Sequence, residues 1–131
     1  MIKYLENKEL QAKALVQLYI KAGIDRPITD LARIQKMIDH SNLIISAWDG
    51  SALVGIARAV TDFGYCCYLS DLAVDQHYQK MGIGRSLVTL IQKAIGYEVS
   101  LILMSSPDST VFYEKLGFKH FSNGYISKGI L

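Results

Sequence analysis

The strongest constraint on the fold is a strand-like run that leads through a glycine-bearing turn into a helix. Tyr68–Val74 is mostly apolar, as expected for a largely buried strand, and Gly82-Ile-Gly84 opens the helix. Apolar residues then recur at helical spacing: Ile83, Leu87, Leu90, Ile91, Ala94 and Ile95. Glycine has no Cβ, so the N–H groups of the turn can close around an anion. Since a helix N-terminus also attracts anions, the pattern indicates a phosphate-binding turn.

Two familiar phosphate-binding loops do not fit this turn. A P-loop needs a lysine followed by Ser or Thr at fixed spacing from its first glycine, and none follows here. A dinucleotide-binding fingerprint needs a third glycine where Leu87 stands, and the link Asp75–Met81 is too long for that tight turn. On the glycines alone, an ordinary strand-to-helix connection remains the alternative.

Two longer motifs distinguish these readings. Gln79-Lys-Met-Gly82-Ile-Gly84 resembles the Q/R-x-x-G-x-G/A signature of the GCN5-related N-acetyltransferase (GNAT) superfamily, preceded by its usual lead-in strand. Val111-Phe-Tyr-Glu-Lys-Leu-Gly-Phe118 resembles the segment that closes the acetyl-CoA site in that superfamily. The resemblance covers the chain from about Leu43 onward and weakens over the first forty residues.

The resemblance implies a fold and an acetyl-donor site. The fold is a single α/β domain of the α+β type, with a mixed, mostly antiparallel sheet of about six to seven strands, a splayed parallel pair at its centre and helices on both faces. Acetyl-CoA enters between the splayed strands, its pantetheine along the first strand and its pyrophosphate on the N–H groups of the turn. The residues assigned to it are Leu72, Ala73, Val74, Gln79, Lys80, Met81, Gly82, Ile83, Gly84, Arg85, Ser86 and Ser106.

The resemblance also assigns catalytic roles. Tyr113 matches the tyrosine that protonates the departing thiolate; the alternative is that it only packs in the crevice. Asp71 lies where relatives often place an acidic residue near the amine, and is equally a capping or sheet-edge carboxylate. The N–H of Val74 is the expected oxyanion donor. Ser106 stands where many relatives carry an Asn, so Ser105 either replaces that contact or ends the strand.

Composition indicates a single domain over residues 1–131 that buries a core without disulfides or metals. Half of the residues are hydrophobic, and the net charge of +2 is too small and scattered to indicate a nucleic-acid surface. No apolar run is long enough to span a membrane, and the N-terminus lacks a signal-peptide core. Adjacent Cys66 and Cys67 are poorly placed to pair, and free thiols fit the cytoplasm. The separated histidines predict no metal site.

The remaining elements follow from local patterns. A short strand is expected over Met1–Leu5, a helix over Lys8–Ala22 stopped by Gly23, and a second helix capped by Thr29 or Asp30. Strands over Leu43–Trp48, Ala52–Val60 and Tyr65–Val74 form a meander, the first pair joined by a type I′ turn at Asp49-Gly50. Val99–Ser105 follows the glycine-turn helix and is parallel to Tyr65–Val74. A short helix runs from Pro107 to Lys115, and Phe118–Phe121 and Tyr125–Lys128 form a last hairpin.

The resemblance to the GNAT superfamily implies an enzyme that transfers acetyl from acetyl-CoA to a primary amine by direct attack in a ternary complex. A small-molecule acceptor is favoured, since the Arg58…Thr61-Asp62 pattern is similar to members acting on small amines. A protein or peptide amine, or an acyl-CoA-binding module without turnover, are the alternatives. No nucleic-acid or membrane partner is expected. A homodimer formed near Tyr125–Lys128 is a further expectation, against a monomer whose edge is guarded by Lys119, His120 and Lys128.

Overall fold

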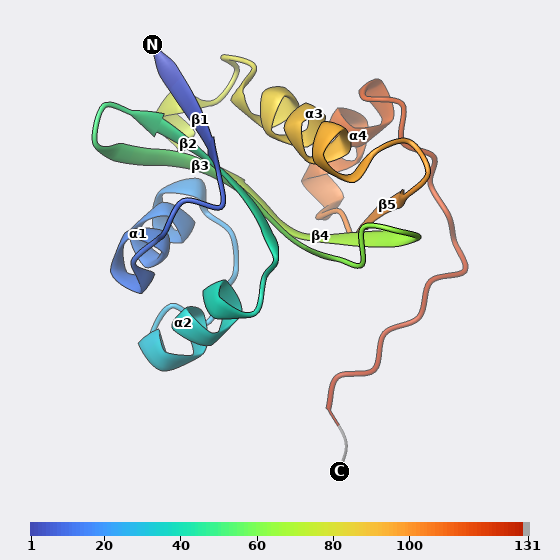
Figure 1. Cartoon of the computed structure of the whole chain (residues 1–131), viewed down its shortest axis with the longest axis horizontal. Coiled ribbons are helices and arrows are strands. Elements are labelled where there is room, and N and C mark those ends of the chain that lie inside the picture. Colours follow the sequence, from blue (N-terminus) through green and yellow to red (C-terminus); the bar gives the residue numbers. More distant parts are fainter. Residues whose placement is uncertain (130–131) are drawn as a thin grey trace.

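The strands of the sheet pair in the order in which they occur along the chain (Figure 1). A computed structural model describes residues 1–129, with strands β1 (Ile2–Glu6), β2 (Leu43–Asp49), β3 (Ala52–Thr61), β4 (Cys66–Val74) and β5 (Ser100–Leu103). Neighbouring strands from β1 to β4 are antiparallel, and β4 and β5 are parallel. The predicted class and the parallel pair are therefore confirmed. Within residues 1–129 the sheet has five strands rather than six or seven, and the parallel pair lies at its edge rather than its centre.

Two short turns set the antiparallel register. Asp49 pairs with Ala52, so the central residues of the first turn are Gly50 and Ser51, and only Gly50 has a positive φ (59°). The type I′ turn predicted at Asp49-Gly50 is therefore wrong, because that type needs positive φ at both central residues. In the turn between β3 and β4, the Asp62 carboxylate accepts N–H bonds from the backbone of three following residues, Tyr65, Gly64 and Cys66. These bonds lower the pKa of Asp62 to about 2.

Helices cover both faces of the sheet (Figure 1). They are α1 (Ala12–Ala22), α2 (Leu31–Asp39), α3 (Ile83–Ile95) and α4 (Thr110–Lys115), with single 3₁₀ turns at Gln76–Tyr78 and Pro107–Ser109. Gly23 ends α1 in the left-handed conformation (φ 75°), and Asp30 caps α2 by accepting the N–H of Arg33 at 3.0 Å. None of the helices described within residues 1–129 is long and apolar enough to cross a membrane.

Each face has its own core. On one face, Leu87, Val88 and Ile91 of α3 pack with buried residues of the central strands, including Ile45 and Leu69. On the other face, α1 and α2 pack on the sheet through Leu15, Leu18, Tyr19 and Ile34, which meet Ile44, Ile56 and Ala73. The apolar residues that recur at helical spacing in the sequence of α3 are thus largely the ones that the helix buries against the sheet.

The predicted C-terminal hairpin is wrong. Phe118–Phe121 and Tyr125–Lys128 form no strand, and residues 119–129 are exposed throughout. In Figure 1 this segment leaves α4 and runs past β5 away from the sheet. Strand-like residues around an Asn-Gly turn are not sufficient to form a hairpin, because an isolated hairpin is only marginally stable without a sheet or core to pack against.

The α3 core provides a stability test. Leu87 is fully buried, so Leu87→Ala removes buried apolar surface and leaves a cavity, and the free energy of unfolding should fall by about 2–5 kcal/mol. Urea denaturation measures the loss. Thr89→Ala, at an exposed position of the same helix, is the control and should change stability by less than about 0.5 kcal/mol. Equal effects of the two changes would contradict the packing described for α3.

Candidate active site

The site is built where β4 and β5 part. Their pairing covers Cys66–Leu69 of β4 against Ser100–Leu103, and β4 then continues to Val74 with no strand on that side among the described residues. At the same point the register between β3 and β4 shifts, because Leu69 pairs with Ala59 whereas Asp71 pairs with Arg58. Ser70 is the extra residue of this bulge. A bulge bends a strand and increases its twist, which accounts for β4 turning away from β5.

The second half of β4 presents free backbone groups to this gap. The Asp75 N–H donates to the Val54 carbonyl at 2.9 Å, and antiparallel pairing alternates, so Leu72 and Val74 point their N–H and C=O groups away from β3. The Val74 carbonyl accepts a bond from Gln79 Nε2 at 3.2 Å. Leu72 and Val74 are half-buried. Of the three residues predicted to meet the pantetheine, Leu72 and Val74 therefore direct their N–H and C=O groups to an open side of the sheet, whereas Ala73 directs its own to β3.

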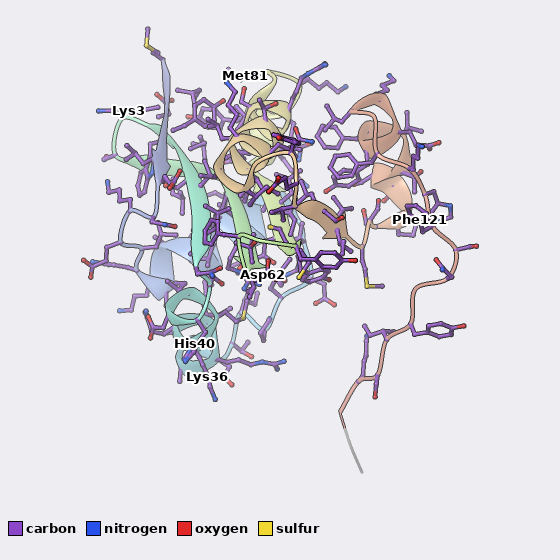
Figure 2. The ribbon with its side chains drawn as sticks, turned by 45° about the vertical axis from the view of Figure 1, so that its right-hand side comes forward. Lys3, Lys36, His40, Asp62, Met81 and Phe121 are labelled. Carbon is purple, nitrogen blue, oxygen red and sulfur yellow. The ribbon has the colours of Figure 1, made fainter. Side chains whose placement is uncertain are left out.

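The glycine turn adds a second set of free N–H groups. Gly82 is the N-cap of α3 in the left-handed conformation (φ 81°), and the first helical bond runs from Ser86 N–H to the Gly82 carbonyl at 3.0 Å. Within the described residues, the N–H groups of Ile83, Gly84 and Arg85 donate to no acceptor, as expected for the first turn of a helix. The exposed side chains of Lys80, Met81 and Arg85 surround this turn, and Figure 2 labels Met81 at the end of the molecule where α3 begins.

The two glycines of the turn are needed for different reasons. A Cβ on Gly82 would meet nothing within 4 Å, so its positive φ is what favours glycine there. A Cβ on Gly84 would lie 3.3 Å from the ring of Phe112, in α4. The sequence reading attributed both glycines to the approach of phosphate oxygens. The structure adds that Gly84 allows α3 and α4 to pack closely.

Tyr113 lies on α4 and is half-buried. Its ring makes edge contacts with Phe112 and Phe118, with ring centres 5.0 and 5.6 Å apart. Burial raises the pKa of Tyr113 above its ordinary value, so the phenol stays protonated at neutral pH. A group that is protonated throughout this range can serve as a proton donor.

Ser105 and Ser106 follow β5 on the opposite side of the gap. Ser105 Oγ donates to the Ser106 carbonyl at 2.6 Å, and Ser106 Oγ donates to Ser109 Oγ at 3.0 Å. Both residues are exposed. Their hydroxyl groups stabilise the turn that leads into α4, and Ser106 remains the predicted contact to CoA.

Asp71 is the centre of a buried charge network beside the bulge. Its side chain is fully buried and accepts bonds from Tyr19 Oη, from Arg26 Nε at 2.7 Å, and from Arg58 Nε at 2.6 Å. The same two arginines bind Ser70: Arg26 Nη2 donates to its carbonyl at 2.8 Å, and Arg58 Nη2 to its hydroxyl at 3.0 Å. The network therefore joins α1, the α1–α2 link and β3 to the point where β4 leaves β5.

The electrostatics of this network constrain what Asp71 can do. Burial alone would raise the pKa of Asp71, but the hydrogen bonds and charge of Arg58, with those of Tyr19 and Arg26, outweigh it and lower that pKa. Burial and the Asp71 carboxylate raise the pKa of Tyr19. Asp71 is thus a carboxylate at neutral pH whose oxygens are already occupied. The general-base role predicted for it stays a prediction, and these bonds weigh against it.

Sequence reasoning named two members of this network but did not pair them: Asp71 as a base or a capping or sheet-edge carboxylate, and Arg58 within the Arg58…Thr61-Asp62 pattern. Both are charged residues inside apolar strands and both are buried, which is a signal of pairing. Tyr19 and Arg26 were missed. They are 52 and 45 residues from Asp71 in the chain, and nothing in their local sequence distinguishes them from helix-core and turn residues.

Comparison with known proteins identifies the family of the chain. Residues 11–131 match the family model described as an acetyltransferase (GNAT) domain. The uncharacterised N-acetyltransferase ycf52 of Pyropia yezoensis is 34% identical over 119 residues, covering 86% of this chain and 67% of that protein. The chain therefore belongs to the GNAT acetyltransferase family.

Solved structures share the fold. The protein SA2161 from meticillin-resistant Staphylococcus aureus has a TM-score of 0.85 at 21% identity, covering 100% of this chain and 99% of that one. The aminoglycoside N-acetyltransferase AAC(6')-Iy in complex with CoA has a TM-score of 0.74 at 16% identity, covering 98% and 95%. At these identities the likeness establishes the shared architecture, and that of AAC(6')-Iy is known with CoA bound.

One surface hollow, between the start of α1, α2 and β2, is lined in part by Asn7–Lys13 and Asn42 and by no residue of β4 or of the glycine turn. Within residues 1–129, no three His, Cys, Asp or Glu side chains are placed to hold a metal ion together.

The charge network predicts a pH-dependent contribution to stability. Asp71→Asn leaves two arginines without their buried counter-charge, so the free energy of unfolding at pH 7 should fall by about 3–5 kcal/mol. The pKa of Asp71 is lowered in the folded state, so its contribution is complete above the ordinary carboxyl pKa of about 3.9 and is lost as pH falls through and below it. Urea denaturation from pH 7 to acid should show parent and variant converging.

Asp25→Asn is the control, since Asp25 is exposed beside Arg26 and the change in charge is the same. It should alter stability by less than about 0.5 kcal/mol. A gap between parent and Asp71→Asn that stays constant down to acid pH would contradict the network described.

Proposed function

We propose that the chain is an acetyl-CoA-dependent N-acetyltransferase whose acceptor is a primary amine of a small molecule. The observation that carries the proposal is that two sets of free backbone N–H groups, one at the end of β4 and one at the start of α3, lie next to each other. Gln79 binds the Val74 carbonyl, and so ties the glycine turn to the unpaired end of β4. A Cβ on Gly84 would lie 3.9 Å from Val74 Cγ2, so the end of β4 and the start of α3, which carry these N–H groups, are neighbours.

This arrangement fits the chemistry of the acetyl donor. Amide and thioester groups of an extended pantetheine need backbone partners, which the unpaired edge of β4 offers in the manner of an added strand. A pyrophosphate needs several N–H donors and positive charge, which the start of α3 offers together with Lys80 and Arg85. Both ends of the donor would thus be bound by main-chain groups, whose positions depend on the fold rather than on flexible side chains.

The reaction requires four events at one place. A neutral amine attacks the thioester carbonyl carbon, and the new C–N bond places negative charge on oxygen. An N–H donor at that oxygen stabilises the charge, and we assign this to Val74, whose N–H faces the gap. The C–S bond then breaks, and the thiolate takes a proton. The proton released by the attacking amine leaves to a base or to water.

Tyr113 is the proposed acid for the thiolate. Its phenol is protonated at neutral pH, although burial raises its pKa and makes it a weaker acid. Its position on α4, next to the Phe112 that packs on Gly84, puts it on the helix that borders the glycine turn. General acid catalysis of this kind is typically worth about 10²–10⁴-fold in rate. Asp71, with its oxygens bound by Tyr19, Arg26 and Arg58, is better suited to holding the bulge in shape than to accepting a proton.

The acceptor side is bordered by the α1–α2 link, which Arg26 ties to Ser70. The sequence likeness of Arg58…Thr61-Asp62 to members acting on small amines supports a small acceptor. Cys66 is exposed and Cys67 is buried, and both are free thiols, which supports a reducing compartment such as the cytoplasm.

An assay of CoA release tests the reaction itself. Acetyl-CoA is incubated with a panel of small primary amines and with lysine-containing peptides, and free thiol is measured. Turnover with a small amine is expected. Turnover with peptides alone would overturn the proposal that the acceptor is a small molecule. Tight acetyl-CoA binding without turnover of any amine would overturn the proposal that the protein is an enzyme.

Binding at the glycine turn is tested by two matched substitutions. Gly82 and Gly96 both have φ 81° and open space around a new side chain, but they stand at opposite ends of α3. Gly82→Glu places a carboxylate at the proposed pyrophosphate site, so CoA affinity by calorimetry should fall below detection. Gly96→Glu introduces the same charge away from that site, at a backbone (φ 81°, ψ 168°) that tolerates a side chain less well than the left-handed conformation of Gly82, and should still leave affinity within about twofold. Equal affinities of the two variants would refute the assignment.

The role of Tyr113 is tested by removing one oxygen. Tyr113→Phe keeps the ring and its edge contacts, so stability and acetyl-CoA affinity should change little, while kcat falls about 10²–10⁴-fold. Steady-state kinetics and calorimetry on the same variant measure both. Tyr97→Phe, at a fully exposed position, is the control. If Tyr113→Phe turns over like the parent, the thiolate is protonated by water and Tyr113 serves only in packing.

A further inference from the structure

The β4–α3 link, residues 75–82, determines where the glycine turn lies. Asp75 fixes the start of the link to β3, because its N–H donates to the Val54 carbonyl at 2.9 Å. The Asp75 carboxylate accepts the His77 N–H at 2.9 Å, and the Asp75 carbonyl accepts the Tyr78 N–H at 2.8 Å. These bonds hold the single 3₁₀ turn at Gln76–Tyr78, so the link begins from a fixed point on the sheet.

A side-chain bond ties the middle of this link to the β2–β3 hairpin. Tyr78 Oη donates to Asp49 Oδ2 at 2.7 Å, and Asp49 is the last residue of β2. The ring of Tyr78 is half-buried and packs against the core beneath α3, so the hydroxyl group is the part that reaches the hairpin. The bond to Asp49 raises the pKa of Tyr78, which therefore remains the donor at neutral pH. Figure 1 shows the link, in yellow, beside the hairpin.

Two residues after Tyr78 the backbone enters the left-handed region. Lys80 has φ 65° and Gly82 has φ 81°. Glycine adopts this conformation freely, but a lysine is strained in it and keeps it only where the chain on both sides is fixed. On one side the chain is fixed at Tyr78, and on the other by Ile83, the first residue of α3, which is buried in the core. The conformation that directs the N–H groups of the glycine turn therefore depends on the tie at Tyr78.

We propose that Tyr78 is a positioning residue for the acetyl donor, a role that rests on the proposed function of the glycine turn as the pyrophosphate site. The bond from Tyr78 to Asp49 holds the turn in its binding conformation before the donor arrives. A turn that is already ordered loses less conformational freedom on binding, and the difference is gained as affinity. The β2–β3 hairpin thus acts on the donor site through one hydroxyl group.

Removing one oxygen separates positioning from packing. Tyr78→Phe keeps the ring in the core, so the melting temperature should change little. Acetyl-CoA affinity by calorimetry should fall about three- to tenfold, the range expected for the loss of one hydrogen bond. At saturating donor, kcat should stay within about twofold of the parent, because the hydroxyl acts on the turn and not on the reacting atoms. Tyr4→Phe is the matched control, since Tyr4 is a half-buried tyrosine that packs against the same core.

The acceptor of this bond provides a rescue experiment. Asp49→Asn keeps an oxygen that can accept the hydroxyl, so it should bind acetyl-CoA more tightly than Asp49→Ala, which should match Tyr78→Phe. The double variant of Tyr78→Phe and Asp49→Ala should bind no more weakly than either single variant, because one bond can be lost only once. Losses that add in the double variant overturn the proposal. So does a Tyr78→Phe chain that binds acetyl-CoA like the parent.

Backbone dynamics test the positioning without any donor. In the unliganded parent, the NMR order parameters of the Met81 and Gly82 amides should lie near the roughly 0.85 of rigid backbone. They should fall in Tyr78→Phe and stay unchanged in Tyr4→Phe. A parent chain that binds no acetyl-CoA would overturn the proposed function, and the order parameters would still decide whether Tyr78 holds the turn. Equal order parameters in the parent and in Tyr78→Phe overturn the positioning role.

Discussion

The ion pairs of Asp71 are the interaction on which the rest of the site depends. One buried carboxylate holds two arginines and a tyrosine, and both arginines also bind Ser70 at the bulge. Removing water from such charges is costly unless every partner is present, so the network is stable only when α1, the α1–α2 link and both strands are in place. The bulge that parts β4 from β5 is therefore held in place by residues of α1 and of the α1–α2 link, on the face of the sheet that α1 and α2 cover.

The parting of two parallel strands turns backbone into a binding surface. In a continued sheet, the N–H and C=O groups of Leu72 and Val74 would bind β5 and be unavailable. Because pairing stops at Leu69 and Leu103, these groups have no strand partner on that side, and the N–H groups of Leu72 and Val74 remain free. The bond from Gln79 to Val74 keeps the strand end and the glycine turn together. The free N–H groups of a strand edge and of a helix N-terminus thus lie together at the site that we propose for the acetyl donor.

The glycine turn and the C-terminal segment, residues 119–129, show why a local sequence pattern predicts the structure correctly for one segment and incorrectly for another. Gly82 needs a positive φ, a property of its own backbone, so the turn is visible in the sequence. The Asn123-Gly124 pattern is as clear, yet residues 119–129 form no strand, because a hairpin needs an edge or a core on which to pack. A local pattern specifies what a segment can form, and its neighbours decide whether it does.

The sequence by itself determined the strand, glycine turn and helix from Tyr68 to Ile95, the meander before them, and the family to which they belong. The structural elements follow from hydrophobic periodicity and turn chemistry, which act between residues close in the chain, and the family follows from the resemblance of two short motifs. Only the tertiary structure decided that Asp71 meets Tyr19 and Arg26, that Gly84 makes room for Phe112, and that the parallel pair lies at the sheet edge. Such contacts join segments far apart in sequence, and they depend on strand order and twist, which no local pattern encodes.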